Sequence, residues 1–213
     1  RYMIKEIIIN TSSLLLAINF ILYFIKRKKH PLPLKIFTLY LFIMAIIQLS
    51  SSIMSTFKIN NLFFSHYYFV GQFFLLSLFF RSILQDSRIT KIIDSVIIMV
   101  LSSICIYYLI FPNKYFEFNN FEIAITSIPL IIYCFLFIVK KIEQPNKTYL
   151  YIVSGMFIYI TSSTLLFSTG NIKLFSPIKK VVWLMNATLF IAYHSLVLIE
   201  WFKLFRKKPL LNK

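Results

Sequence analysis

The sequence predicts an all-α, multi-pass membrane protein with seven transmembrane helices that form a single domain over residues 1–213. Three observations lead to this fold class. First, 59% of the 213 residues are apolar and only 14% are charged, whereas a soluble domain carries about 25% charged residues. Second, the apolar residues gather in seven long runs. Third, lysine and arginine concentrate in every second connection between those runs.

The first three expected spans are bounded by basic residues. A hydrocarbon core about 30 Å thick needs roughly 20 helical residues. Residues 7–25 satisfy this length and are followed by the basic residues 26–29, as in a stop-transfer sequence rather than a cleaved signal peptide. The second span is expected at 36–55. The third is expected at 62–80 and is followed by Arg81.

The remaining four spans follow the same rule. They are expected at 92–111, 121–139, 149–168 and 181–202. Proline lies in the connections and the tail except for Pro129, which falls inside the fifth span. Because proline lacks an amide proton and its ring displaces the preceding turn, we expect a kink there.

The basic residues predict the orientation of the chain. Of the 23 lysines and arginines, sixteen lie in 26–35, 81–91, 140–148 and 203–213, and seven lie on the other side. Cytoplasmic connections carry the excess of basic residues, so the N-terminus is expected outside and the C-terminus in the cytoplasm. An even number of spans would break this alternation. The abundance of Ile, Lys, Asn and Phe is typical of a bacterial protein, which places the chain in the cell (inner) membrane.

A net charge of +16 also bears on partners. The basic residues flank apolar spans and form no continuous face, so they predict contact with anionic membrane lipid rather than with nucleic acid.

The two cysteines, Cys105 and Cys134, lie at different expected depths, so we expect two core thiols and no disulfide.

Similar polar patterns indicate a weak internal repeat of the form 3+1+3. Glu122 precedes Thr126 and Ser127 in the fifth span much as Glu6 precedes Thr11 and Ser12 in the first. Spans one to three would then correspond to spans five to seven, with the fourth between them. Chance similarity between apolar helices is the alternative.

Every span carries one polar edge, and these edges supply the candidate ligand-binding residues. Polar groups are costly in lipid and therefore turn into the bundle. Those at helical spacing or near the same depth are His66, Glu122, Thr126, Asn186, Tyr193, His194, Gln48 and Ser52. One interpretation is a polar ligand pocket in the outer half, and the other is a set of contacts between helices.

Individual titratable residues carry narrower expectations. His66 and Glu122 form either a pH-sensitive pair or two solvated groups at the interface, and the sequence favours the second. His194 is the histidine deepest in the hydrocarbon and the strongest single candidate. Asp94 is expected to pair with Arg88 or Lys91, and Glu200 with Lys203 or Arg206.

No spacing of residues indicates catalysis, a cofactor or a metal ion. Paired carboxylates, a Ser–His arrangement and a His/Asp cluster are all missing from the sequence pattern. An enzyme is therefore disfavoured, no cofactor is expected, and no metal-binding residues are assigned.

Two families resemble the chain in topology alone. The seven spans resemble microbial rhodopsins, but the middle of the last span, residues 190–194, contains no lysine that could carry retinal. The 3+1+3 arrangement resembles small sugar transporters, but their Pro-Gln motifs and flexible glycines are absent. No family is therefore assigned.

The function expected from these observations is a non-enzymatic membrane sensor or receptor-like subunit. It would bind a ligand or partner within the helix bundle and act through a partner protein or a second copy of the chain, because its short connections carry no output domain. The alternatives are a structural subunit or membrane-acting effector of a larger complex, and a transporter or channel for a small solute.

Overall fold

The computed structural model describes residues 2–116, 119–168 and 176–205, which are helical apart from their connections. Short 3-10 segments lie at η1 (Arg27–Lys29) and η2 (Pro112–Phe116). The seven α-helices are α1 (Tyr2–Ile25), α2 (Leu32–Thr56), α3 (Phe64–Leu84), α4 (Ser87–Ile110), α5 (Asn120–Ile142), α6 (Leu150–Ser168) and α7 (Ser176–Phe205). All seven are long and apolar enough to cross a membrane, which confirms the predicted all-α, multi-pass class.

The helices begin and end close to the expected spans, with the largest differences where a helix continues beyond its apolar run. α4 begins at Ser87 rather than at residue 92, because Asp86 caps it. The Asp86 carboxylate accepts hydrogen bonds from the backbone N–H groups of Arg88 at 2.8 Å and Ile89 at 3.2 Å. Such a cap satisfies amides that the first turn leaves without partners. α5 runs from Asn120 to Ile142 through Pro129.

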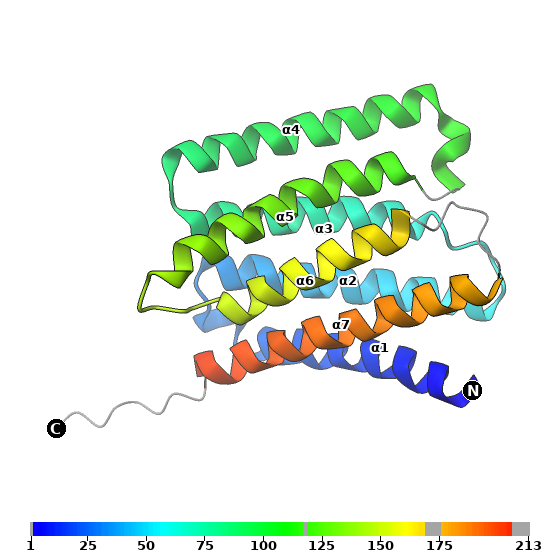
Figure 1. Ribbon diagram of the computed structural model, residues 1–213, viewed down its shortest axis with the longest axis horizontal. Coiled ribbons are helices and arrows are strands. Elements are labelled where there is room, and N and C mark those ends of the chain that lie inside the picture. Colours follow the sequence, from blue (N-terminus) through cyan, green and yellow to red (C-terminus); the bar gives the residue numbers. More distant parts are fainter. Residues whose placement is uncertain (1, 117–118, 169–175, 206–213) are drawn as a thin grey trace.

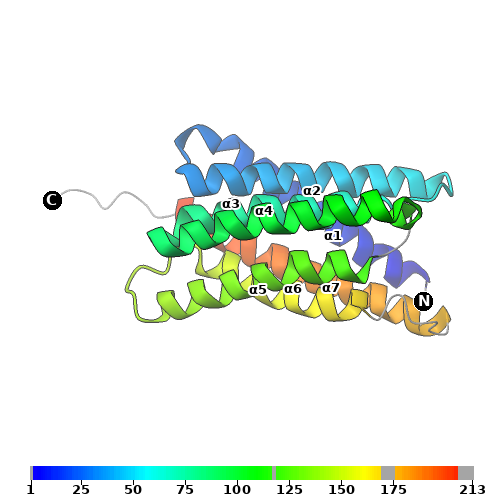
Figure 2. The ribbon, with the colours of Figure 1, turned by 90° about the horizontal axis from the view of Figure 1, so that it is seen from above.

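Six helices form a closed ring, and α4 lies outside it. Neighbouring helices around the ring are in contact in the order α1, α2, α3, α5, α6 and α7, and α7 closes the ring against α1. α4 packs mainly on α3, with a smaller contact to α5. The helices follow roughly one common axis (Figures 1 and 2), and α4 lies at the edge of the bundle beside α3 and α5 (Figure 1). α4 is thus the helix with the least support from its neighbours.

The ring encloses an aromatic core, and its outer face is apolar. Phe37, Phe79 and Phe80 are fully buried, and the rings of Phe37 and Phe79 lie 5.6 Å apart. Large apolar side chains also point outward, and Leu109 on α4 is 82% exposed. An apolar exterior is expected where helices face lipid rather than water.

The peripheral place of α4 corrects one prediction about the cysteines. Cys134 on α5 is buried, as predicted for a core thiol, and both cysteines are free. The prediction is wrong for Cys105, which is exposed on α4. Hydropathy gives the depth of a residue in the membrane but not whether its helix lies inside the ring.

Close packing of α6 on α7 depends on a glycine. A Cβ atom at Gly155 would lie 3.0 Å from Cδ2 of Tyr193 and 3.3 Å from the side chain of Leu196. Contacts this short require a neighbouring atom to move. Gly71 on α3 is different, because its nearest neighbour would be the flexible end of Met44 at 3.5 Å.

Candidate functional site

A buried polar cluster closes the end of the bundle where α3 and α5 begin, here called the His66 end. His66 lies in the first turn of α3 and Glu122 in the first turn of α5. His66 Nδ1 lies 2.6 Å from Glu122 Oε2, and the two residues are 5% and 1% exposed. The structure therefore corrects the expectation of two solvated interfacial groups, because both side chains are buried and in contact.

The start of α5 explains why an acidic side chain is stable there. Asn119 caps the helix and accepts hydrogen bonds from the N–H groups of Phe121 at 3.0 Å and Glu122 at 3.3 Å. The N-terminus of a helix carries a partial positive charge that favours a carboxylate. Thr126 donates from Oγ1 to the Glu122 carbonyl at 2.7 Å, so it supports the same turn without reaching the carboxylate.

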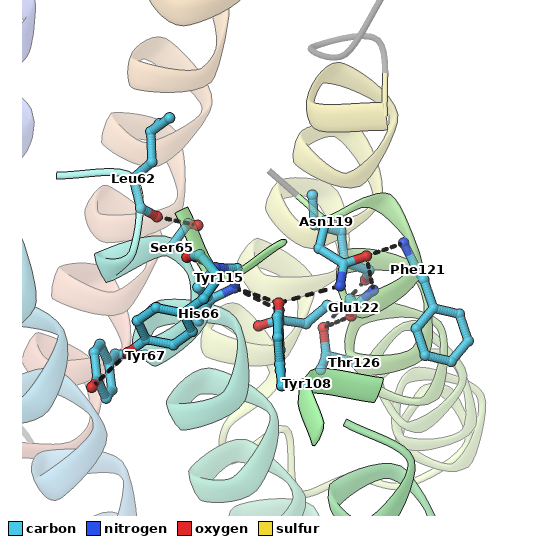
Figure 3. Close-up of polar contacts among 11 residues, drawn as sticks. Leu62, Ser65, His66, Tyr67, Tyr108, Tyr115, Asn119, Phe121, Glu122 and Thr126 are labelled. Carbon is cyan, nitrogen blue, oxygen red and sulfur yellow. Dashed lines mark hydrogen bonds and ion pairs between the residues drawn. The ribbon is translucent and has the colours of Figure 1, made fainter. Parts of the chain in front are cut away.

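α4 and its following connection complete the cluster (Figure 3). The Tyr108 hydroxyl, near the end of α4, donates to Glu122 Oε2 and lies 2.8 Å from His66 Nδ1. Asn119 donates from Nδ2 to that hydroxyl at 3.2 Å. His66 Nε2 lies 2.7 Å from the carbonyl of Tyr115 in η2. One imidazole therefore links α3, α4, α5 and the α4–α5 connection.

Tyr115 also shields the histidine from the surroundings. Its ring stacks on His66 with centroids 5.1 Å apart, and its hydroxyl donates to that of Tyr67 at 2.8 Å. Burial, followed by the hydrogen bond to Tyr67, raises the pKa of Tyr115 to about 12. The phenol therefore stays protonated and can keep donating at any physiological pH.

The geometry allows two proton arrangements of equal net charge. A carbonyl only accepts, so Nε2 of His66 carries a hydrogen toward Tyr115. The proton between the remaining nitrogen and Glu122 can then lie on His66, giving an ion pair, or on Glu122, giving two neutral groups. Within the described residues, Glu122 Oε1 has no hydrogen-bond partner although it is buried. The cluster thus holds one proton that its two acceptors share.

A second group, here called the tyrosine cluster, comprises Tyr40, Tyr68, Gln72, Tyr159 and Tyr193, all of which are buried except Tyr68, which is half-buried. The hydroxyls of Tyr68 and Tyr159 lie 2.8 Å apart, and the rings of Tyr159 and Tyr193 stack at 5.6 Å. The Tyr40 hydroxyl lies near Gln72 and Tyr193. These residues come from α2, α3, α6 and α7 and make the centre of the ring polar.

The structure distributes the eight predicted site residues over several places. His66, Glu122 and Thr126 meet at the His66 end, Tyr193 belongs to the tyrosine cluster, and the Asn186 side chain reaches Tyr159 of that cluster. His194 lies beside Asn19 of α1, with the Asn19 amide 3.2 Å from His194 Nδ1 and 2.8 Å from its carbonyl. Gln48 is half-buried and Ser52 is exposed on α2. Binding of a ligand by these residues stays a prediction.

One expected ion pair is replaced by another contact, and the second is present but long. Asp94 bonds to Arg81 of α3 at 2.7 Å rather than to Arg88 or Lys91, and this contact fastens α4 to the ring. Glu200 is fully buried and caps α6, accepting from the N–H groups of Tyr149 at 2.8 Å and Tyr151 at 3.0 Å. Lys203 Nζ also lies 4.0 Å from Glu200 Oε1, which confirms the expected Glu200–Lys203 ion pair, and Arg206 lies outside the described residues.

Three members of the polar cluster at the His66 end were not predicted. Tyr108 and Tyr115 belong to aromatic groups that are also typical of a membrane interface. Asn119 could have been found, because an asparagine followed by a glutamate three residues later is typical of a capped helix start. Among the described residues, no group of three or more His, Cys, Asp or Glu side chains could hold a metal ion.

Comparison of the chain with known protein families, with curated proteins and with solved structures finds no match. The functional argument therefore depends on the geometry of the two polar clusters.

Proposed function

We propose that the protein is a sensor or receptor-like subunit of the cell membrane that responds to protons or to a ligand at the His66 end and acts through a partner protein. The carrying observation is the buried contact between His66 and Glu122. In the orientation that the basic residues predict, the N-terminus and the His66 end face outward. The end with most of the lysines and arginines, here called the basic end, faces the cytoplasm.

The charge balance of the cluster supports a sensing role. His66 and Glu122 together are neutral with one shared proton. Gain or loss of a proton would leave one uncompensated charge in a site of low dielectric constant, which is costly. The cluster must then open to water or rearrange. A change of protonation is thereby coupled to a change of structure, as in other histidine-based switches.

α4 is the element that such a change would move. Its end contributes Tyr108 to the cluster, and η2, which follows it, contributes the Tyr115 carbonyl. α4 lies outside the ring and has fewer contacts than the other helices. Loss of the cluster would free this end, while the Arg81–Asp94 contact holds the other. A partner that packs on α4 would register the movement.

A transporter or channel for a small solute is the second candidate, because the tyrosine cluster makes the interior of the ring polar. A solute path must also reach the basic end. There the fully buried side chains of Phe37, Phe79 and Phe80 occupy the space between the helices, so the polar interior is closed on that side. The sensor interpretation needs no such path and is preferred.

The test uses Cys105, which is exposed on α4, whereas Cys134 is buried. An environment-sensitive fluorophore on Cys105, in the protein reconstituted in nanodiscs, is followed from pH 4 to pH 9. We expect a single titration in the natural chain and its loss in His66→Gln. His194→Gln, which alters a buried histidine away from the cluster, should keep the titration.

Two outcomes would overturn the proposal. One is a fluorescence signal in the natural chain that does not change with pH, and the other is a titration that survives His66→Gln unchanged. Size-exclusion chromatography of each variant confirms that the comparison is between folded proteins. Cross-linking from labelled Cys105 then shows whether a partner protein packs on α4.

A further inference from the structure

A groove at the basic end lies between α1 and α2 and has no place in the proposed sensing mechanism. Its volume is about 530 Å³, within the usual range of about 300–1,000 Å³ for small-ligand sites. The end of α1, the connection through η1 and the start of α2 line it. It therefore lies at the level where a spanning helix passes from hydrocarbon to lipid headgroups.

The floor of the groove is aromatic and open to the outside of the bundle. The ring of Phe20 lies 5.5 Å from that of Phe24 and 5.2 Å from that of Phe42. Phe24 and Phe42 are 42% and 40% exposed, so part of each ring faces the outside of the bundle. In a bilayer such a surface contacts acyl chains, and the groove gives one chain a defined position.

The rim of the groove carries three positive charges. Arg27, Lys28 and Lys35 line it, and all three are exposed. The Arg27 guanidinium lies over the ring of Phe24, 4.4 Å from its centroid, a contact that holds the cation above the apolar floor. Among the described side chains, no ion pair joins these three cations to a carboxylate.

We propose that this groove binds an anionic glycerophospholipid, with its phosphate at Arg27, Lys28 and Lys35 and one acyl chain along Phe20, Phe24 and Phe42. Charge complementarity selects the anionic headgroup, and the apolar floor requires a chain attached to it. Basic pockets between spanning helices bind anionic headgroups in this way. The inference does not depend on the His66–Glu122 switch.

The test measures lipid affinity of the purified chain in detergent by native mass spectrometry. The probes are phosphatidylglycerol and phosphatidylcholine with identical acyl chains. The variant Arg27→Gln/Lys35→Gln removes two cations from the rim. The matched control, Arg88→Gln/Lys91→Gln, removes two exposed cations from the start of α4 at the same end of the bundle.

We expect the natural chain to prefer phosphatidylglycerol. Each basic residue near an anionic lipid contributes about fivefold in affinity, so the rim variant should lose about 25-fold for phosphatidylglycerol and little for phosphatidylcholine. The control variant should lose little for either. Leu39→Trp, which fills the groove without changing charge, should weaken binding of both lipids.

Equal losses in the rim and control variants would show general surface attraction and overturn the proposal. So would equal affinity of the natural chain for the two lipids. Displacement of the lipid by an equal concentration of glycerol 3-phosphate would also contradict it, because the headgroup alone would then account for binding. The His66→Gln variant should bind phosphatidylglycerol like the natural chain, which separates this test from that of the sensor.

Discussion

Replacement of Glu122 by glutamine tests whether the buried cluster holds the bundle together. The carboxylate accepts from Tyr108 and contacts His66 at 2.6 Å. Polar contacts between membrane helices contribute about 0.6 kcal/mol on average and up to about 1.7 kcal/mol. Glutamine cannot carry the negative charge or the shared proton, although its amide oxygen can still accept from Tyr108. Both contacts are therefore weakened, and the free energy of unfolding should fall by about 1–2 kcal/mol. Glutamine keeps the shape of the side chain, so little of this loss comes from packing.

A double-mutant cycle isolates the pair itself. His66→Gln, Glu122→Gln and the double variant are unfolded reversibly by a denaturing detergent in bicelles, and the coupling energy is calculated from the three losses. We expect about 1 kcal/mol or more. The control cycle uses Arg81→Gln and Asp94→Asn, whose side chains are 48% and 44% exposed. Exposed ion pairs contribute about 0.2–1 kcal/mol. A His66–Glu122 coupling near zero, or below that of the control, would refute the reasoning.

Three further predictions concern packing, pH dependence and helix capping. Gly155→Ala should lower the unfolding free energy by about 1–3 kcal/mol through overpacking against α7, whereas Gly71→Ala should be neutral or slightly stabilising; equal effects in detergent unfolding would contradict the packing argument. Burial, followed by the charge of a neighbouring lysine, lowers the pKa of His30. A lowered pKa means that His30 binds the proton more tightly in the unfolded chain than in the folded one. The free energy of unfolding is therefore highest above a pH of about 6.5 and decreases as the pH falls below that value. His30→Phe should reduce the difference in thermal midpoint between pH 7.5 and pH 5, and an unchanged difference would sink the idea. Glu200→Gln should cost about 1–2 kcal/mol and increase hydrogen exchange at the start of α6, and unchanged exchange there would show that the cap is dispensable.

The sequence was sufficient for the spans, because hydropathy and length decide which segments can cross a membrane. It was less accurate at helix starts such as that of α4, where the Asp86 cap extends the helix into polar residues. Hydropathy also did not show that α4 lies outside the ring, since an outer and an inner helix can be equally apolar. The exposure of Cys105 follows from that single fact.

The candidate site was only partly predictable for the same reason. His66 and Glu122 were found as polar residues at one depth, but their contact depends on α3 packing against α5. Partners such as Tyr108 lie on α4 and enter the cluster only in the folded arrangement. For Glu200 the expected ion pair with Lys203 is present, but the shorter hydrogen bonds to the backbone of Tyr149 and Tyr151 were not predicted, because they depend on α6 packing against α7.

The most direct test of the sensing proposal is nitrogen NMR of the three histidine side chains in lipid, followed as a function of pH. His66→Gln identifies the His66 resonances, and Glu122→Gln shows whether they depend on the carboxylate. The proposal predicts that the His66 titration has the same midpoint as the Cys105 fluorescence and changes in Glu122→Gln. A His66 ring that titrates like a free imidazole near pH 6.5, exchanges freely with water and ignores Glu122→Gln would contradict it.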